Sequence, residues 1–134
     1  MSRSETVRDN LRSLAEAGLH PGNLPLGYLP GPRPGDPPVP DPLAAPVIAA
    51  AFRLRARGYG LAEICRLLEA LGARSRRGRP LSRQALRAVL ANPFYAGKVR
   101  LNGKFYEGRH EPLVSEELFW KVQGHLTERR LNLL

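Results

Sequence analysis

Three polar residues near the middle of the sequence carry side chains that can read base pairs. Arg83 and Arg87 are four residues apart, and Gln84 adjoins the first of them. On an α-helix, residues at a spacing of four are neighbours on one side of the surface. In the major groove of duplex DNA, Arg can form two hydrogen bonds with guanine and Gln can form two with adenine. We therefore predict that Arg83, Gln84 and Arg87 contact DNA bases.

A second set of residues suits contacts with phosphate groups, which position a protein on DNA without reading its sequence. Most are arginines in the loop of residues 73–80, and a serine follows where the next helix is predicted to start. Further cations belong to a predicted hairpin over residues 97–107, from which they can reach the DNA backbone or the minor groove. The predicted backbone contacts are Arg74, Arg76, Arg77, Arg79, Ser82, Lys98, Arg100 and Lys104.

The net charge of the 134-residue chain is +9, and it is concentrated in one block. Residues 53–109 hold 14 of the 21 Lys and Arg but only 3 of the 12 Asp and Glu, which gives this block a net charge of +11. Each flanking segment has a net charge of −1. A basic block between nearly neutral flanks is typical of proteins that bind polyanions. For any single arginine, a solvated surface position or an internal ion pair is an equally good explanation.

Several classes of function lack support in the sequence. It has no run of 18 apolar residues for a membrane span, and its start has no apolar signal region. The single cysteine, Cys65, allows no disulfide framework and falls within an apolar helical stripe. His20, His110 and His125 lack the paired spacing of metal ligands. We expect a cytoplasmic, DNA-associated protein without a catalytic site, a metal or a cofactor.

Apolar residues recurring at steps of three and four predict the helices that must position these side chains. Asp41-Pro42 is a typical helix start, since Asp caps a helix and Pro suits its first turn. Gly58 and Gly72 mark two helix ends. The predicted helices cover residues 4–17, 41–57, 61–71, 83–91 and 116 to about 130. Their predicted core residues include Val47, Ile48, Ala51, Phe52, Leu54, Leu61, Ile64, Cys65, Leu68, Leu71, Leu86, Val89, Leu90, Leu118, Phe119, Val122 and Leu126.

Two further segments have a clear local signature. Asn102-Gly103 is the pair that most favours a type I′ turn, and the alternating residues on either side predict a β-hairpin. Residues 21–46 hold ten of the thirteen prolines, which predicts an extended or turn-like arm. We expect a mobile loop near residues 31–38 of this arm. Its apolar residues Leu24, Leu26, Tyr28, Leu29 and Val39 are expected to lie against the folded body.

The order of these elements predicts a fold class. A helix, a shorter helix, a basic loop, a helix with exposed Arg and Gln, and then a hairpin resemble a helix-turn-helix arrangement with a possible wing. We expect a mainly α, helix-turn-helix-like helical domain with a small β-hairpin and a proline-rich N-terminal arm.

An ordered series of motifs also resembles the recombinase (DNA-binding) domain of the large serine recombinases, the family of phage serine integrases. The series begins with LPLGY at residues 24–28 and continues with DPLAAPVIAAAFRLRARG at 41–58 and EICRLLEALG at 63–72. Its most specific part is NPFYAG at 92–97, followed by the predicted hairpin and then by EGRHEP at 107–112.

This resemblance implies a non-catalytic domain that binds double-stranded DNA and recognises a recombination half-site. In the family, a catalytic domain precedes it through a long helix, and a zinc ribbon with a coiled coil follows it. We accordingly expect residues 1–20 to be the end of a connecting helix, 21–46 a proline-rich arm and 41–130 the DNA-binding domain. We expect neither the catalytic domain nor the zinc ribbon in this chain, which makes it no enzyme by itself. Other recombinase domains or subunits are expected partners.

Two other readings stay open at this point. A stand-alone basic protein that binds RNA would need exposed aromatic residues for stacking on bases. A regulatory module would instead bind a recombinase through the Leu/Trp face of the last predicted helix.

Overall fold

The computed structural model describes residues 24–75 and 78–132. The predicted helix over residues 4–17 and the segment 1–20 lie outside this range. The helices are α2 (Ala45–Ala56), α3 (Leu61–Ala70), α4 (Arg83–Leu90), the 3-10 helix η1 (Pro93–Ala96) and α5 (Glu116–Asn132). The strands are β1 (Tyr28–Leu29), β2 (Val39–Pro40), β3 (Lys98–Leu101) and β4 (Lys104–Glu107).

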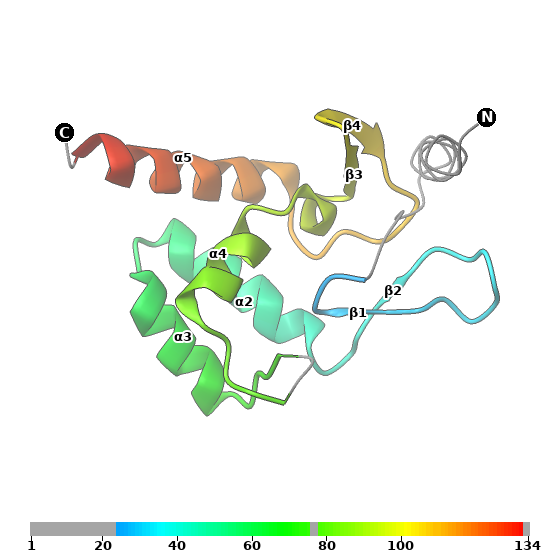
Figure 1. The fold of residues 1–134 in the computed structure, drawn as a ribbon, viewed down its shortest axis with the longest axis horizontal. Helices are drawn as coiled ribbons and strands as arrows, with labels where there is room; N and C mark the ends of the chain where they lie inside the picture. Colours follow the sequence, from blue (N-terminus) through cyan, green and yellow to red (C-terminus); the bar gives the residue numbers. More distant parts are fainter. Residues whose placement is uncertain (1–23, 76–77, 133–134) are drawn as a thin grey trace, which may run out of the picture.

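The helices form a small bundle, and the strands form two separate hairpins at its edge (Figure 1). α2 packs against both α3 and α5, while α4 packs against α3 and the middle of α5. η1 joins α4 to the β3–β4 hairpin and also contacts α5. The predicted mainly α fold class is therefore confirmed.

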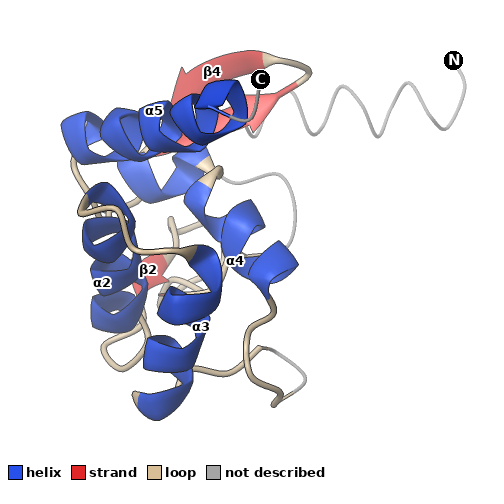
Figure 2. Ribbon diagram, turned by 90° about the vertical axis from the view of Figure 1, so that its left-hand side faces the viewer, coloured by secondary structure: helices blue, strands red, loops and turns tan. Residues whose placement is uncertain are grey.

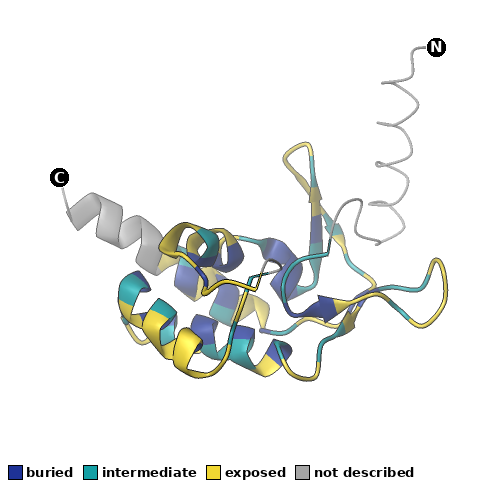
Figure 3. Ribbon diagram, turned by 60° about the horizontal axis from the view of Figure 1, so that its bottom comes forward, coloured by how far each residue is buried: buried dark blue, intermediate teal, exposed yellow. Residues whose placement is uncertain are grey.

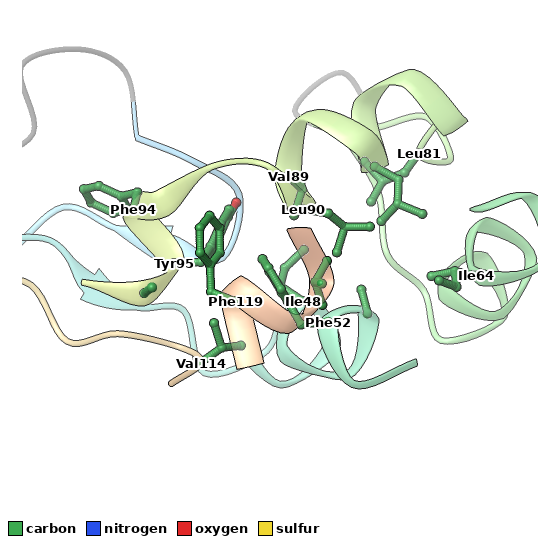
Figure 4. Close-up of a cluster of buried hydrophobic side chains, with 14 of the residues drawn as sticks. Ile48, Phe52, Ile64, Leu81, Val89, Leu90, Phe94, Tyr95, Val114 and Phe119 are labelled. Atoms are coloured by element: carbon green, nitrogen blue, oxygen red, sulfur yellow. The ribbon is translucent and has the colours of Figure 1, made fainter. Parts of the chain in front are cut away.

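The hydrophobic core lies where the four α-helices and η1 meet (Figure 4). Phe52 of α2 is central, because its ring centroid lies 5.6 Å from that of Tyr95 and 6.2 Å from that of Phe119. The largest fully buried side chains are Tyr95, Phe52, Phe94, Ile64, Leu68, Leu86, Leu90, Val99 and Val122.

The predicted apolar stripes supply most of this core, with an exception at the end of α3. Leu61, Ile64 and Leu68 are buried as predicted, but Leu71 is 62% exposed. Leu71 is the residue that caps α3, and the chain turns away directly after it at Gly72, where φ is +87°. Cys65 is half-buried at the edge of the core rather than inside it.

α2 begins at Ala45, so the prediction of a helix starting at Asp41-Pro42 is wrong. The Asp41 carboxylate accepts hydrogen bonds from the backbone N–H groups of Leu43 and Ala44, and its carbonyl accepts one from Ala45. Asp41 therefore caps a turn that leads directly into α2. The reason lies in Pro46, which has no N–H to donate and whose ring clashes with the carbonyl four residues earlier in a helix interior. The helix therefore starts where Pro46 falls in its first turn.

The proline-rich arm contains a short antiparallel pairing, β1 with β2, that the sequence does not predict. Tyr28 pairs with Pro40, and Leu29 pairs with Val39. Tyr28 is buried and docks the arm, whereas Leu29 and Val39 are 42% and 39% exposed. The expectation that these last two lie against the body is wrong, because successive strand residues point to opposite sides and Tyr28 takes the inner side.

The β3–β4 hairpin forms with the predicted turn. Lys98 pairs with Glu107, and Leu101 pairs with Lys104. Asn102 and Gly103 have φ angles of +52° and +79°, as a type I′ turn requires at both central positions. The hairpin stands on η1, because Val99 of β3 is buried against the core.

The two most specific motifs of the sequence, NPFYAG and EGRHEP, meet at η1. The Tyr95 carbonyl accepts hydrogen bonds from the backbone N–H groups of Leu113 and Val114, and the Gly97 carbonyl accepts one from Gly108. The Tyr95 hydroxyl donates to the carbonyl of Leu26 in the arm. These contacts fasten the arm, η1 and the segment after the hairpin to one another.

Candidate nucleic-acid interface

α4 divides cleanly into a buried and an exposed side. Its buried side carries Leu86, Val89 and Leu90, which is the face predicted from the sequence. The exposed residues are Arg83, Gln84, Arg87 and Ala88, followed by the C-cap residue Ala91. The structure therefore brings the three predicted base-contacting side chains together on one solvent-facing surface.

Both ends of α4 are held in place. The Ser82 hydroxyl accepts a hydrogen bond of 3.0 Å from the Ala85 N–H, which caps the first turn as predicted. At the other end, the Gln123 side chain of α5 donates to the Leu90 carbonyl. α4 is only eight residues long, so these contacts and its packing on α3 and α5 fix its orientation.

The two arginines of α4 are available for an external partner. Across the residues whose side chains the structure describes, neither Arg83 nor Arg87 forms a hydrogen bond or an ion pair. Burial raises the pKa of the Cys65 thiol in α3. The positive charge of Arg83 lies close enough to oppose this rise in part. Among the described residues, no carboxylate forms an ion pair with the positive charges that α4 presents.

The loop before α4 is closed at its base. The Ser75 N–H donates to the Arg79 carbonyl, and the Arg79 N–H donates to the Ser75 hydroxyl. Arg76 and Arg77, which are predicted backbone contacts, lie outside the described residues, and Arg79 is exposed. The connection from α3 to α4 is longer than the three- or four-residue turn of a typical helix-turn-helix motif.

Arg74 has a structural role as well as an exposed position. One nitrogen of its guanidinium donates to the carbonyls of Glu69 and Ala73, at 3.4 and 2.7 Å. A cation at this place also complements the dipole of α3 at its C-terminal end. The remaining N–H groups of the guanidinium stay on the surface.

The cations of the hairpin differ from one another. Lys98 forms ion pairs with Glu107 across the strands and with Glu116 in the first turn of α5. Hydrogen bonds to these two carboxylates raise the pKa of Lys98. Arg100 and Lys104 are exposed and have no such partner among the described residues. Lys98 therefore ties the hairpin to α5, whereas Arg100 and Lys104 face outward.

The elements that carry these cations lie toward one side of the molecule (Figure 2). In Figure 2, the turn of the hairpin, α4 and the loop before α4 all lie toward the right of the view, from top to bottom, while α2 lies toward the left. Figure 3 shows that the hairpin turn and the tip of the β1–β2 loop are the exposed ends of the two hairpins. We call the surface formed by α4, the exposed residues Arg74 and Arg79 of the preceding loop, and the outer part of the β3–β4 hairpin the basic face.

The sequence reasoning missed two buried polar residues, Arg55 and His110, which are 4% and 5% exposed. Arg55 of α2 donates a hydrogen bond of 2.7 Å to the Tyr59 carbonyl, which fixes the turn before α3. His110 lies beneath the arm, against Tyr28 and Phe94. Neither belongs to the basic face, and no periodic pattern in the sequence marks a buried Arg or His.

Two kinds of feature are absent from residues 24–75 and 78–132. No cluster of three or more His, Cys, Asp or Glu there is arranged to hold a metal ion. No helix in this part of the chain combines the length and apolar character needed to cross a membrane.

A short helix that exposes Arg and Gln beside a basic loop is typical of DNA-binding domains. Residues 42–129 match the Recombinase family, and the chain belongs to that family. This confirms the resemblance inferred from the motifs. No curated protein matches the chain.

Two solved structures share the fold. One is described as a crystal structure of an LSR–DNA complex, with a TM-score of 0.74, 21% identity and coverage of 95% of this chain. The other comes from work on the sequence requirements of the Listeria innocua prophage attP site, with a TM-score of 0.77, 21% identity and coverage of 91%. This chain spans 38% and 51% of those two chains.

Proposed function

We propose that this chain is a duplex DNA-binding module of a site-specific serine recombinase, and that α4 recognises part of a recombination half-site. The observation that carries this proposal is the exposed side of α4 in a member of the Recombinase family. Arg83, Gln84 and Arg87 are exposed there and form no hydrogen bond or ion pair with the other residues that the structure describes. The DNA complex among the structural relatives supports the same partner.

In this proposal α4 lies in the major groove. Arg83 and Arg87 form paired hydrogen bonds with guanine, and Gln84 does the same with adenine. Ala88 and Ala91 are exposed along the same side and are small, which lets the helix approach the base edges closely. Their methyl groups suit contact with the methyl group of thymine.

The rest of the basic face holds the phosphate backbone on either side. Arg74, Arg76, Arg77, Arg79 and the Ser82 hydroxyl contact phosphates next to the start of α4, and Arg100 and Lys104 do so from the hairpin. These contacts contribute affinity and register rather than sequence preference. Lys98 acts indirectly, because its ion pairs fix the hairpin relative to α5.

The proposed module binds DNA and leaves the chemistry of strand exchange to other parts of a recombinase. Within the described residues, the exposed serines act in turns and helix caps: Ser82 caps α4, and Ser115 accepts from Leu118 at the start of α5. Other recombinase domains or subunits are the proposed protein partners.

Selection from a pool of random duplexes tests the proposal. The protein is bound to the pool at several salt concentrations, and the retained DNA is sequenced. Recovery of a motif the length of one half-site, together with steep salt dependence, supports recognition by α4. Steep salt dependence without a motif contradicts base reading, and preferential retention of single-stranded RNA in a parallel competition contradicts the duplex DNA assignment.

A further inference from the structure

Phe105 occupies an unusual place on the β3–β4 hairpin. Because Arg100 pairs with Phe105 and Lys98 pairs with Glu107, these four side chains share one face of the hairpin. The opposite face carries Val99, which is buried, and Tyr106, which packs against the core. The face with Phe105 therefore points to solvent.

An aromatic side chain on this solvent face has no role in the fold that the structure reveals. Phe105 is 52% exposed and does not belong to the hydrophobic core. Among the residues whose side chains are described, it forms no ring–ring contact and no contact with a cation. A two-stranded hairpin normally places polar residues on its solvated face, so the large apolar side chain here suits an external contact.

The surroundings of Phe105 specify the charge of the partner. Arg100 lies directly across from it, and Lys104 precedes it next to the turn. The negative charge of Glu107 is already matched by Lys98 at the base of the hairpin. Arg100 thus shares the solvent face with the Phe105 ring, whereas Lys104 projects from the opposite face beside the turn. The hairpin turn lies toward the same side of the molecule as α4 (Figure 2).

We propose that the hairpin tip enters the minor groove next to the major groove that α4 occupies, with the Phe105 ring packed against deoxyribose. This inference rests on the proposed function and adds a contact to it. The walls of the minor groove are formed by sugars, whose C–H groups offer apolar surface, and its negative potential attracts arginine. Phe105 thereby supplies affinity through apolar contact, while Arg100 supplies it through charge.

The different physical origins of the two contributions make them separable. The salt slope is the change in the logarithm of the binding constant with the logarithm of the salt concentration, and it depends on how many phosphates the protein neutralises. Loss of an apolar contact neutralises no fewer phosphates and therefore leaves the salt slope unchanged. Phe105→Ala is expected to weaken binding to the selected duplex about tenfold without changing that slope. Arg100→Ala is expected to weaken binding and to reduce the slope by about 1. Leu43→Ala, which truncates an 86% exposed apolar residue before α2, is the matched control and binds as the wild type does.

Hydroxyl-radical footprinting of the same complexes locates the contact, because it reports which deoxyribose groups are covered. The wild type and Leu43→Ala are expected to protect a patch of sugars beside the α4 site, and Phe105→Ala to lose that patch alone. Phe105→Thr, which keeps a high strand propensity, is expected to behave as Phe105→Ala does and excludes an unfolded hairpin as the cause.

The outcomes distinguish this inference from the function on which it rests. If the wild type binds the duplex and both Phe105 variants retain its affinity and its sugar protection, the minor-groove contact is wrong while the DNA-binding function stands. If the wild type does not bind duplex DNA at all, the proposed function fails and this inference fails with it.

Discussion

The imidazole of His110 lies flat on the ring of Phe94, with 3.6 Å between the ring centroids and 5° between their planes. The same imidazole places its Nε2 atom 2.6 Å from the Phe94 carbonyl oxygen. The ring of Tyr28 meets both rings edge-on, at 4.8 Å from Phe94 and 5.5 Å from His110. The two most specific motifs of the sequence thus serve mainly to join the arm, η1 and the segment after the hairpin.

Gly108 should tolerate no side chain, because a Cβ atom there would lie within 3 Å of the His110 ring and of the Gly97 carbonyl oxygen. We expect Gly108→Ala to lower the free energy of unfolding by about 2 kcal/mol, as overpacking of a well-packed site does. Gly124→Ala is the control, since a Cβ there meets nothing within 4 Å and helix propensity favours Ala. Urea titrations of both variants check this. Equal stability of Gly108→Ala and wild type would contradict the packing described for His110.

Tyr28 should make the fold sensitive to alkaline pH. Burial, and to a lesser extent the nearby carboxylate of Glu111, raises the pKa of its hydroxyl well above the ordinary value of 10.0. In the folded protein the hydroxyl stays protonated and donates to the Glu111 carbonyl, while in the unfolded chain it ionises near pH 10. Its contribution to stability is therefore complete below pH 10 and is lost as the pH rises above it.

Tyr28→Phe removes both the hydrogen bond and the titrating group. We expect this variant to be less stable than the wild type at neutral pH by about 1 kcal/mol, the usual net value of a hydrogen bond. The difference should shrink above pH 10. Chemical denaturation between pH 7 and pH 11 measures it, and a constant difference over that range would be inconsistent with a buried, protonated Tyr28.

Substitutions on α4 should change which sequences are bound. We expect Arg83→Ala and Arg87→Ala each to cost about 1–3 kcal/mol of binding to the selected duplex and to relax base preference at one position. Arg79→Ala in the preceding loop should weaken binding to all sequences alike and reduce the salt slope by about 1. Competition between the selected duplex and a scrambled one measures both effects. The assignment of base reading to α4 fails if all three variants lose affinity uniformly.

A substitution of Lys98 tests whether this residue contacts DNA or instead positions the β3–β4 hairpin. Its ammonium is already paired with Glu107 and Glu116. We expect Lys98→Met to leave the salt slope of DNA binding unchanged, in contrast to Arg100→Ala. Glu116→Gln should lower the stability of the wild type but not that of Lys98→Met. The reason is that the ion pair between Lys98 and Glu116 is already absent from Lys98→Met. A reduced salt slope in Lys98→Met would instead assign Lys98 to the phosphate backbone.

The helices and the β3–β4 hairpin could be predicted from the sequence because their signals are local. The stripe of Leu86, Val89 and Leu90 and the Asn102-Gly103 pair each lie within one element. Arg83, Gln84 and Arg87, the predicted base-reading residues, are exposed for the same reason, since they lie on the side of α4 opposite to that stripe. The assignment of these residues to DNA bases stays a prediction.

The features that escaped prediction depend on contacts between distant segments. β1 and β2 have two residues each and lie in a proline-rich segment, so no alternating pattern predicts them. Their pairing accompanies the docking of Tyr28 on the folded body. His110 is buried by partners from the arm and from η1. The ion pair of Lys98 with Glu116 likewise joins two elements that are separate in the sequence. From their charge and their place in the sequence pattern alone, His110 and Lys98 are predicted to lie on the surface.

The β1–β2 pairing has a consequence for how this region can change. The pairing brings the two ends of the intervening loop together, and Asp41 donates its N–H to the Gly27 carbonyl just beyond it. These contacts at the base of the loop, and not the residues inside it, set the path of the chain into α2. Because lengthening a loop with fixed ends costs little free energy, residues 31–38 are a natural place for insertions, deletions or fused tags that leave the basic face unaltered.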